Sequence, residues 1–261
     1  MPTPLVQRFT TQLLQALDYA HSNGVIHTDI QPGNIMIQLP DPALIPDFLE
    51  KTASSTTSPS TQDDESYQIL TSQSLKGFYF ADPDFDMLTL NVALADWGVA
   101  SWTESHLTEE IQPTLLRAPE VLPEAPWGPS ADIFNLGALI PELIIGHTLF
   151  DAHLPNGDYS IGKHFKEMEF LLGPLPDHVK VEGNPEIVND VFDAEGDFKD
   201  QRAMRGEKLE GKFKELDEVE KAKLTAFVKR ILTLDKDKRP SAKVLLEDSW
   251  LRHEHTEEQK K

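Results

Sequence analysis

A short polar segment, HTDIQPGNIM at positions 27–36, carries residue types that phosphoryl transfer requires. Asp29 could accept the proton of an attacking hydroxyl, and Asn34 offers an amide oxygen to a hard cation such as Mg²⁺. A second acid, Asp96, stands in an Asp-Trp-Gly tripeptide and could supply another oxygen ligand. Aspartate, proline, glycine and asparagine also make up ordinary turns. The segment alone therefore does not separate a reaction site from a polar turn.

The composition excludes several classes of function. The chain of 261 residues has 24 Lys and Arg against 44 Asp and Glu, a formal charge of −20, which argues against direct binding to nucleic acid. It has no cysteine, so disulfides and thiolate metal sites are excluded, and we expect an intracellular protein of the cytoplasm or nucleus. We expect no secretory signal, and the most apolar window, IFNLGALIPELIIG, is too short to span a membrane.

The elements that must position these residues can be read from the spacing of apolar residues. Leu5, Phe9, Leu13 and Leu17 recur at helical spacing and predict a helix over 3–23. We expect Thr3 to cap this helix and Gly24 to end it. The stretch NIMI after the polar segment predicts a short strand, and LNVALADWG predicts another directly before Asp96.

Between these strands, residues 38–90 lose the pattern, and the Ser/Thr-rich part at 52–66 is predicted to be disordered. A buried helix is predicted over 131–146, and further helices follow in SIGKHFKEMEFLLG, KAKLTAFVKRILTL and SAKVLLEDSWL. The predicted fold class is mainly α with a few short β-strands.

Five features occur in a fixed order along the chain, and together they resemble the C-terminal lobe of a eukaryotic protein kinase. They are the segment His27-Thr28-Asp29 with Asn34, then Asp96-Trp97-Gly98, then Ala118-Pro119-Glu120, then Asp132 at the start of the buried helix, and late in the chain Arg239. Each feature is common by itself, whereas the ordered set is not. The stretches IQPTLLRAPEVL, PWGPSADIFNLGALIPELIIGHTLF and LLGPLP resemble the SR-protein kinases, in particular the fungal SR-protein-kinase-like group of serine/threonine kinases.

The resemblance implies a protein-kinase-like fold and an ATP-dependent transferase. Asp29 would be the residue that accepts the substrate proton, and Asn34 and Asp96 would hold Mg²⁺ and the nucleotide. Met36 would form the floor under the adenine of ATP. Gln31 stands where the family has a lysine that contacts the transferred phosphate. His27 is expected to be a packed, hydrogen-bonded histidine and not a base.

The resemblance also implies structural roles and a domain arrangement. Glu120 and Arg239 would form a buried ion pair. Asp132 would bind the backbone of the 27–34 segment. The kinase lobe would cover 1–251, interrupted by the 38–90 insert and followed by a polar tail at 252–261.

The sequence departs from the family pattern in two ways. It contains no Gly-rich G-x-G-x-x-G segment, and its first lysine is Lys51, so the expected chain is a C-terminal lobe without the N-terminal lobe. Gln31 replaces a lysine, and Pro113 replaces a threonine that contacts the same aspartate. These two changes put catalytic power in doubt.

Three readings of function remain open at this point. The first is a serine/threonine protein kinase. The second is a truncated pseudokinase lobe that binds partners without transferring phosphate. The third is a small-molecule phosphotransferase, against which the Ala-Pro-Glu tripeptide, Asp132 and Arg239 all count.

The region between Glu182 and Glu220 suggests a class of partner. It holds 13 acidic and six basic residues. SR-protein kinases, which the chain resembles, bind Arg-rich peptides through acidic surface on this lobe, and arginine pairs bidentately with carboxylates. The expected partners are therefore ATP and basic Arg/Ser-rich protein substrates. The alternative is a solvated acidic face without a partner.

Overall fold

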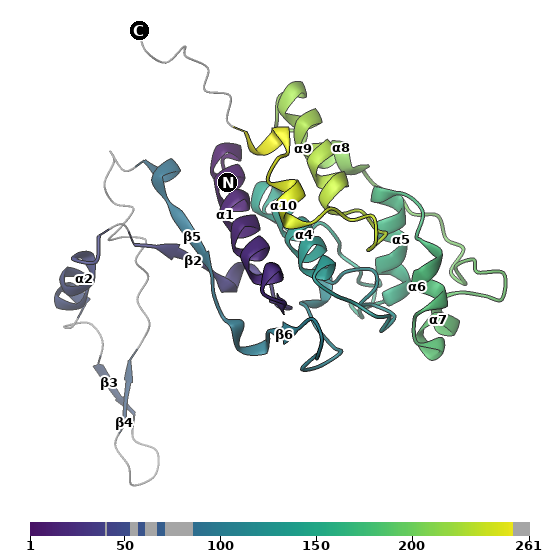
Figure 1. Cartoon of the computed structure of the whole chain (residues 1–261), viewed down its shortest axis with the longest axis horizontal. Helices are drawn as coiled ribbons and strands as arrows, with labels where there is room; N and C mark the ends of the chain where they lie inside the picture. The colour runs from purple at the N-terminus through teal and green to yellow at the C-terminus, as the bar shows by residue number, and fades with distance from the viewer. Residues whose placement is uncertain (40, 53–56, 61–66, 71–85, 253–261) are drawn as a thin grey trace. The chain divides into compact units, whose positions relative to one another are not determined.

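The computed structural model describes residues 1–39, 41–52, 57–60, 67–70 and 86–252 (Figure 1). Contacts divide the chain into two compact units, one of Met1–Met36 with Val92–Lys261 and the other of Ile37–Asn91. Among the described helices, none combines the length and apolar character that crossing a membrane would require. The predicted fold class, mainly helical with a few short strands, is confirmed.

The first unit is built mostly from helices. Its α-helices are α1 (Thr3–Ser22), α4 (Ser130–Ile145), α5 (Ile161–Leu172), α6 (Asp177–Val181), α7 (Pro185–Val191), α8 (Leu209–Lys212), α9 (Glu218–Ile231) and α10 (Ala242–Leu245). Short 3₁₀ turns lie between them: η1 (Pro32–Asn34), η4 (Trp97–Val99), η5 (Thr114–Leu116) and η6 (Ser249–Leu251).

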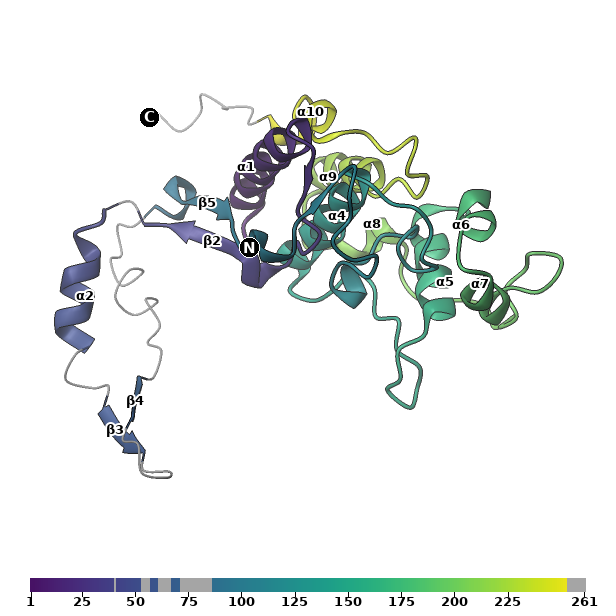
Figure 2. The same cartoon turned by 60° about the horizontal axis from the view of Figure 1, so that its bottom comes forward.

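Helix α4 is the centre of the core. Every residue from Ala131 to Pro141 is buried, and both α1 and α9 pack against this helix (Figure 1, Figure 2). Gly137 permits the close approach of α9, since a Cβ atom there would lie 2.9 Å from Leu232 Cδ2. A buried, all-round apolar helix of this kind gives a rigid base for polar groups at its N-terminal end.

Glycines end two of the main helices, as local capping rules predict. Gly24 after α1 has φ 72°, as expected for a glycine that ends a helix, and Gly146 after α4 has φ 82°. The prediction that Thr3 caps α1 is wrong. Pro2 occupies the cap position without a side-chain hydrogen bond, and Thr3 is already the first helical residue.

Two short pairs of strands flank the polar segments. Strand β1 (Val25–Ile26) pairs antiparallel with β6 (Ser101–Trp102), and β2 (Ile35–Gln38) pairs with β5 (Asn91–Leu94). The strands predicted in NIMI and LNVALADWG correspond to β2 and β5. These pairs place the segment after β1 beside the segment after β5.

The second unit contains α2 (Leu44–Thr52), β3 (Thr57–Ser60), β4 (Tyr67–Leu70) and η3 (Met87–Thr89). Within the stretch 52–66, which is predicted to be disordered, the described residues are Thr52, the last residue of α2, and strand β3, which pairs antiparallel with β4. The prediction rested on the scarcity of apolar side chains, whereas a ladder is formed by backbone groups. Residues 53–56 and 61–66 lie outside the described residues.

Candidate active site

The segment from His27 to Asn34, here called the 27–34 loop, connects β1 to β2 and is held by the start of α4. Asp132, fully buried in the first turn of α4, accepts hydrogen bonds from the backbone N–H groups of His27 (2.7 Å) and Thr28 (2.9 Å). His21 in α1 contacts the same carboxylate through Nε2 at 2.9 Å. The predicted contact between Asp132 and the loop backbone is confirmed.

His27 is a packed histidine, as predicted. The backbone N–H of Asp29 donates to its Nδ1 at 3.2 Å, so Nε2 carries the hydrogen and donates to the Ala95 carbonyl at 3.0 Å. The Trp97 ring meets the imidazole edge-on, with 4.6 Å between ring centroids. Because both ring nitrogens are engaged, His27 is not free to exchange a proton with a substrate.

The Asp29 carboxylate is oriented by two neutral amide side chains. Gln31 donates from Nε2 to Oδ1 (3.0 Å) and Oδ2 (2.9 Å) of Asp29. Asn34 donates from Nδ2 to Oδ2 of Asp29 and to its backbone carbonyl, both at 2.8 Å. Asp29 itself is only half-buried, so its carboxylate remains accessible to a reacting group. The amides of Gln31 and Asn34 thus give the Asp29 carboxylate hydrogen-bond donors, although Gln31 and Pro113 replace the lysine and the threonine of the family pattern.

The two residues predicted to hold Mg²⁺, Asn34 and Asp96, each carry a side-chain oxygen. Asn34 uses both hydrogens of its amide on Asp29, which leaves the carbonyl Oδ1 as its remaining polar group. Asp96 is exposed, with a left-handed backbone (φ 60°), and its carboxylate makes no capping bond within the described part of the chain. A hydrogen bond of 2.8 Å from Ala95 N–H to the Asn34 carbonyl joins the two segments. One amide oxygen and one carboxylate are ligands that Mg²⁺ prefers.

Gln112 ties the segment after Asp96 to the 27–34 loop and to α4. Its backbone N–H donates to the Thr28 carbonyl (2.9 Å), and its side chain bridges the Ala131 carbonyl and the Ala118 N–H, both at 2.8 Å. Arg117 donates from Nε and Nη2 to the Gln112 carbonyl at 3.3 and 3.0 Å. Gln112 adopts φ 70°, a strained value for a residue with a side chain, which these contacts stabilise.

A pocket of about 350 Å³ opens beside Asp29 and is lined by the loop and by the segment after Asp96. Its walls include Gln31, Pro113, Glu110 and Arg117, and the Arg117 Nη2 lies 3.6 Å from Glu110 Oε1. The lining of this pocket therefore includes Asp29 and the ion pair of Arg117 with Glu110.

Glu120 and Arg239 form the predicted buried ion pair. The guanidinium donates from Nη1 to Oε1 (2.7 Å) and from Nη2 to Oε2 (3.0 Å), and both side chains are 0% exposed. Arg239 also donates to the carbonyls of Ser130, Thr233 and Leu234. The pair is structural, because it joins the residues before α4 to the loop after α9 and is closed to solvent.

The structure brings together Asp29, Gln31 and Asn34, and it places Asp96 at the end of the adjoining strand. Met36 lies on β2 with 57% of its surface exposed, two positions beyond Asn34. Sequence analysis missed Gln112 and also Asn135, whose buried side chain contacts Ile30. A polar residue three positions after Asp132 in an otherwise apolar helix was the available signal for Asn135.

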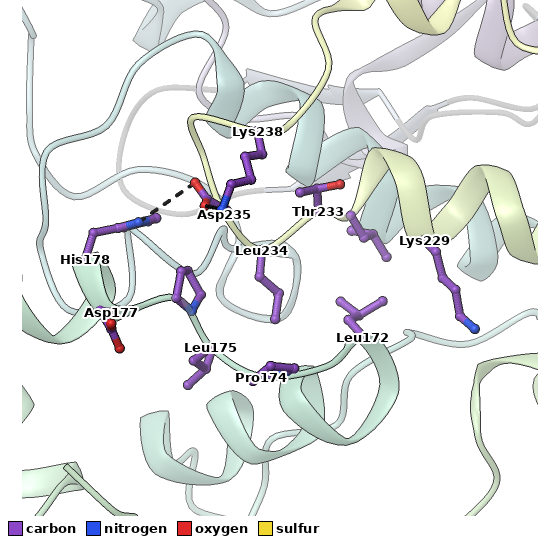
Figure 3. Close-up of a pocket in the computed structure, with 12 residues that line it drawn as sticks. Leu172, Pro174, Leu175, Asp177, His178, Lys229, Thr233, Leu234, Asp235 and Lys238 are labelled. Carbon is purple, nitrogen blue, oxygen red and sulfur yellow. Dashed lines mark ion pairs between the residues drawn. The ribbon is translucent and has the colours of Figure 1, made fainter. Parts of the chain in front are cut away.

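A pocket of about 630 Å³ lined by other residues lies between the end of α5 and the loop after α9 (Figure 3). His178 Nδ1 lies 4.0 Å from Asp235 Oδ1 there, as the dashed line in Figure 3 shows. The other oxygen of Asp235 is 2.7 Å from Lys238 Nζ, and this hydrogen bond lowers the pKa of the carboxyl below its usual range. The residues that the sequence analysis singled out, Asp29 and Asn34, lie at the 27–34 loop and not at this pocket, and the candidate site is placed at the loop.

Comparison with known proteins points to one family. The protein kinase domain matches residues 85–251. A serine/threonine protein kinase of Aspergillus fumigatus is 34% identical over 257 residues, covering 96% of this chain and 58% of that protein. The serine/threonine-protein kinase SRPK of Physarum polycephalum is 29% identical over 273 residues, covering 96% of this chain and 61% of that protein. The chain thus spans about three fifths of the length of these curated relatives.

A likeness also exists to a solved structure. The crystal structure of a kinase domain superimposes with a TM-score of 0.64 at 22% identity, covering 97% of this chain and 67% of that chain. At this identity the likeness concerns the fold.

Proposed function

Because the chain belongs to the protein kinase family, we propose that it takes part in ATP-dependent phosphoryl transfer to serine or threonine hydroxyls of proteins. The observation that carries this proposal is the carboxylate of half-buried Asp29, which accepts hydrogen bonds from Gln31 and Asn34, in a residue that lines a pocket of about 350 Å³. Phosphoryl transfer depends mainly on positioning and charge neutralisation, so a carboxylate held in one orientation is the group it requires.

The residues have distinct proposed roles. Asp29 orients the substrate hydroxyl and accepts its proton, and Gln31 keeps the carboxylate in place. Asn34 Oδ1 and the Asp96 carboxylate would hold Mg²⁺ and, through it, the nucleotide. Protein kinases use ATP and Mg²⁺, and the cation neutralises negative charge on the phosphates. Met36, exposed on β2, would contact the adenine.

We also propose that the substrates are basic Arg/Ser-rich proteins. Support comes from the resemblance to SR-protein kinases and from acidic residues on α7 and the turn after it. Glu186, Asp190, Glu195 and Asp197 are exposed, and the structure gives them no ion pair within its described residues. Asp200, in contrast, is paired with Lys166 at 3.1 Å and with Arg202 at 2.8 Å. The free carboxylates would bind guanidinium groups.

The activity is tested with purified 1–261, Mg²⁺, ATP and an Arg-Ser repeat peptide. We expect slow phosphate incorporation, since residues 1–261 hold no Gly-rich segment to cover the phosphates. Asp29→Asn should lower it about a hundredfold or more. The exposed Asp237→Asn serves as the control and should leave it unchanged. If the wild-type chain transfers no phosphate and binds no nucleotide with Mg²⁺, the proposal is wrong and a pseudokinase lobe remains.

The substrate class is tested by affinity and not by turnover. At about 0.15 M salt, exposed charges are screened beyond about 8 Å, so a diffuse acidic face would not distinguish arginine from lysine. An Arg-Ser repeat peptide should bind several-fold more tightly than a Lys-Ser peptide, and the difference should shrink in Glu186→Gln/Asp190→Asn. The control variant Glu215→Gln/Glu218→Gln removes the same charge near the start of α9 and should leave the difference in affinity between the two peptides unchanged. Equal affinities for both peptides would contradict the proposed substrate class and favour the alternative, an acidic face that is only solvated.

A further inference from the structure

Two side chains of α4 hold the backbone on either side of Asp29. The N–H groups of His27 and Thr28 donate to Asp132, at 2.7 and 2.9 Å. The Ile30 N–H donates to Asn135 Oδ1 at 3.0 Å, and Asn135 Nδ2 returns a hydrogen bond of 2.8 Å to the Ile30 carbonyl. Asp29 is the residue between these two anchored stretches.

Asp132 and Asn135 come from the same face of one helix. They are three positions apart in α4, which places both side chains on the side of the helix that faces the 27–34 loop. Both are 0% exposed, and the helix that carries them is the most deeply buried element of the core. The two anchors are therefore fixed relative to each other by a rigid element.

The residue type at position 135 matches its task. An amide side chain provides one acceptor and two donors, so it can satisfy both the N–H and the carbonyl of one residue. A carboxylate would place an oxygen against the Ile30 carbonyl oxygen, and serine is too short to serve both groups at once. Among the side chains of similar size, asparagine is the one that completes this pair of bonds.

The loop needs a second anchor because its backbone is strained. Thr28 has φ 70°, an uncommon value that is unfavourable for a β-branched residue. Such a conformation costs on the order of 1–3 kcal/mol and persists only where the surroundings over-determine it. Asp132 fixes the loop before Asp29, and Asn135 ties the backbone after Asp29 to α4. The other hydrogen bonds to this backbone, from Asn34 to the carbonyls of Asp29 and Gln31, lie within the loop and do not anchor it to the core.

We infer that Asn135 is a positioning residue: by clamping Ile30 to α4, it keeps Asp29 in register with the amides of Gln31 and Asn34. The inference rests on the proposed function only for its effect on turnover. The clamp itself is a property of the folded chain and can be measured without any reaction.

The test uses ¹⁵N-labelled 1–261 and three variants. Asn135→Ser removes both bonds to Ile30, and Asn135→Asp keeps the acceptor for the Ile30 N–H but loses the donor to its carbonyl. Ile140→Val, a buried change in the same helix, controls for general loss of stability. Amide hydrogen exchange of Ile30 and Thr28 reports the two anchors separately, and the side-chain NH₂ signals of Gln31 and Asn34 report the position of Asp29.

In Asn135→Ser we expect exchange at Ile30 to quicken at least about tenfold relative to Ile140→Val. Exchange at Thr28, which Asp132 holds, should change by less than about twofold. The NH₂ signals should shift in Asn135→Ser and stay in place in the control. In Asn135→Asp, Ile30 exchange should remain slow while the NH₂ signals shift, so this variant decides the question if the serine variant does not fold.

Two results would overturn the inference. Unchanged exchange at Ile30 in Asn135→Ser would show that the clamp does not hold the loop. Faster exchange at Ile30 with unmoved NH₂ signals would show an ordinary structural contact with no influence on Asp29. If the wild-type chain turns over, kcat of Asn135→Ser should fall about tenfold or more with KM for the peptide unchanged. A chain without turnover would count against the proposed function, while the exchange and NH₂ data would still decide the role of Asn135.

Discussion

Replacing Glu120 with glutamine should destabilise the fold far more than removing an exposed charge. The Arg239 guanidinium has five N–H donors, and each has an acceptor: the two Glu120 oxygens and the carbonyls of Ser130, Thr233 and Leu234. Glu120→Gln removes the only carboxylate in this set and turns one acceptor into a donor that faces another donor.

The size of the effect follows from the burial of both partners. Removing one member of a buried ion pair strands the other charge and costs about 3–5 kcal/mol. In a domain of this length that loss corresponds to a fall in Tm of roughly 6–20 °C. Arg239→Met should cost more, because it strands the Glu120 carboxylate and also leaves three carbonyls without their donor.

The assay is urea denaturation of 1–261 and its variants, followed by circular dichroism. The control is Glu247→Gln, which breaks a pair with Arg252 of 2.9 Å between side chains that are 79% and 65% exposed. An exposed pair of this kind contributes about 1 kcal/mol or less. The double variant Glu120→Gln/Arg239→Met should lose less than the sum of the single losses, because the two changes share one contact. A cost below about 1 kcal/mol for Glu120→Gln would refute the reasoning.

Three further predictions concern the core. Burial lowers the pKa of His164 to about 3, so only the unfolded chain takes up its proton near pH 6.5, and the fold should lose about 2 kcal/mol between pH 7 and pH 5. His164→Asn, which does not titrate, should reduce the difference between the unfolding free energies measured by urea denaturation at pH 7 and pH 5. An equal difference in the wild type and the variant would contradict the prediction. Gly137→Ala should cost about 1–3 kcal/mol, because the new Cβ would lie 2.9 Å from Leu232 Cδ2, and a neutral result by the same assay would show that α9 can shift. Thr225→Val should add about 1 kcal/mol, since the buried hydroxyl has no hydrogen-bond partner among the described residues, and a loss would indicate a partner such as water.

The parts of the fold that depend on local pattern could be predicted from the sequence. Apolar spacing identified α1 and α4 within one residue at their ends, alternation identified β5, and the short apolar stretch NIMI identified β2. The ordered motifs led to the protein kinase family through resemblance. Caps and ladders were less predictable, as Thr3 and the strand β3 show, because backbone groups can be satisfied without the side chains that signal them.

The contacts around Asp29 could be predicted only in part. The residue types at Asp29, Asn34 and Asp96 suggested a site, and their roles remain predictions. Asn135 and Gln112 act through hydrogen bonds to residues far away in the sequence, which no local pattern encodes. The positive φ values of Thr28 and Gln112 were also unpredictable, because a non-glycine residue gives no signal for them.

The hydrogen bond between the Ala95 N–H and the Asn34 carbonyl has a consequence for how this chain tolerates change in length. It closes the long excursion between β2 and β5 at its base, with Asn34 on one side and Asp96 on the other. The entropy of closing a loop grows only with the logarithm of its length, so doubling the excursion costs about 0.6 kcal/mol. A change in the length of the segment between β2 and β5 should therefore leave the Ala95–Asn34 hydrogen bond in place. Asn34 and Asp96 would then keep their positions beside this bond when residues are inserted into the segment or removed from it.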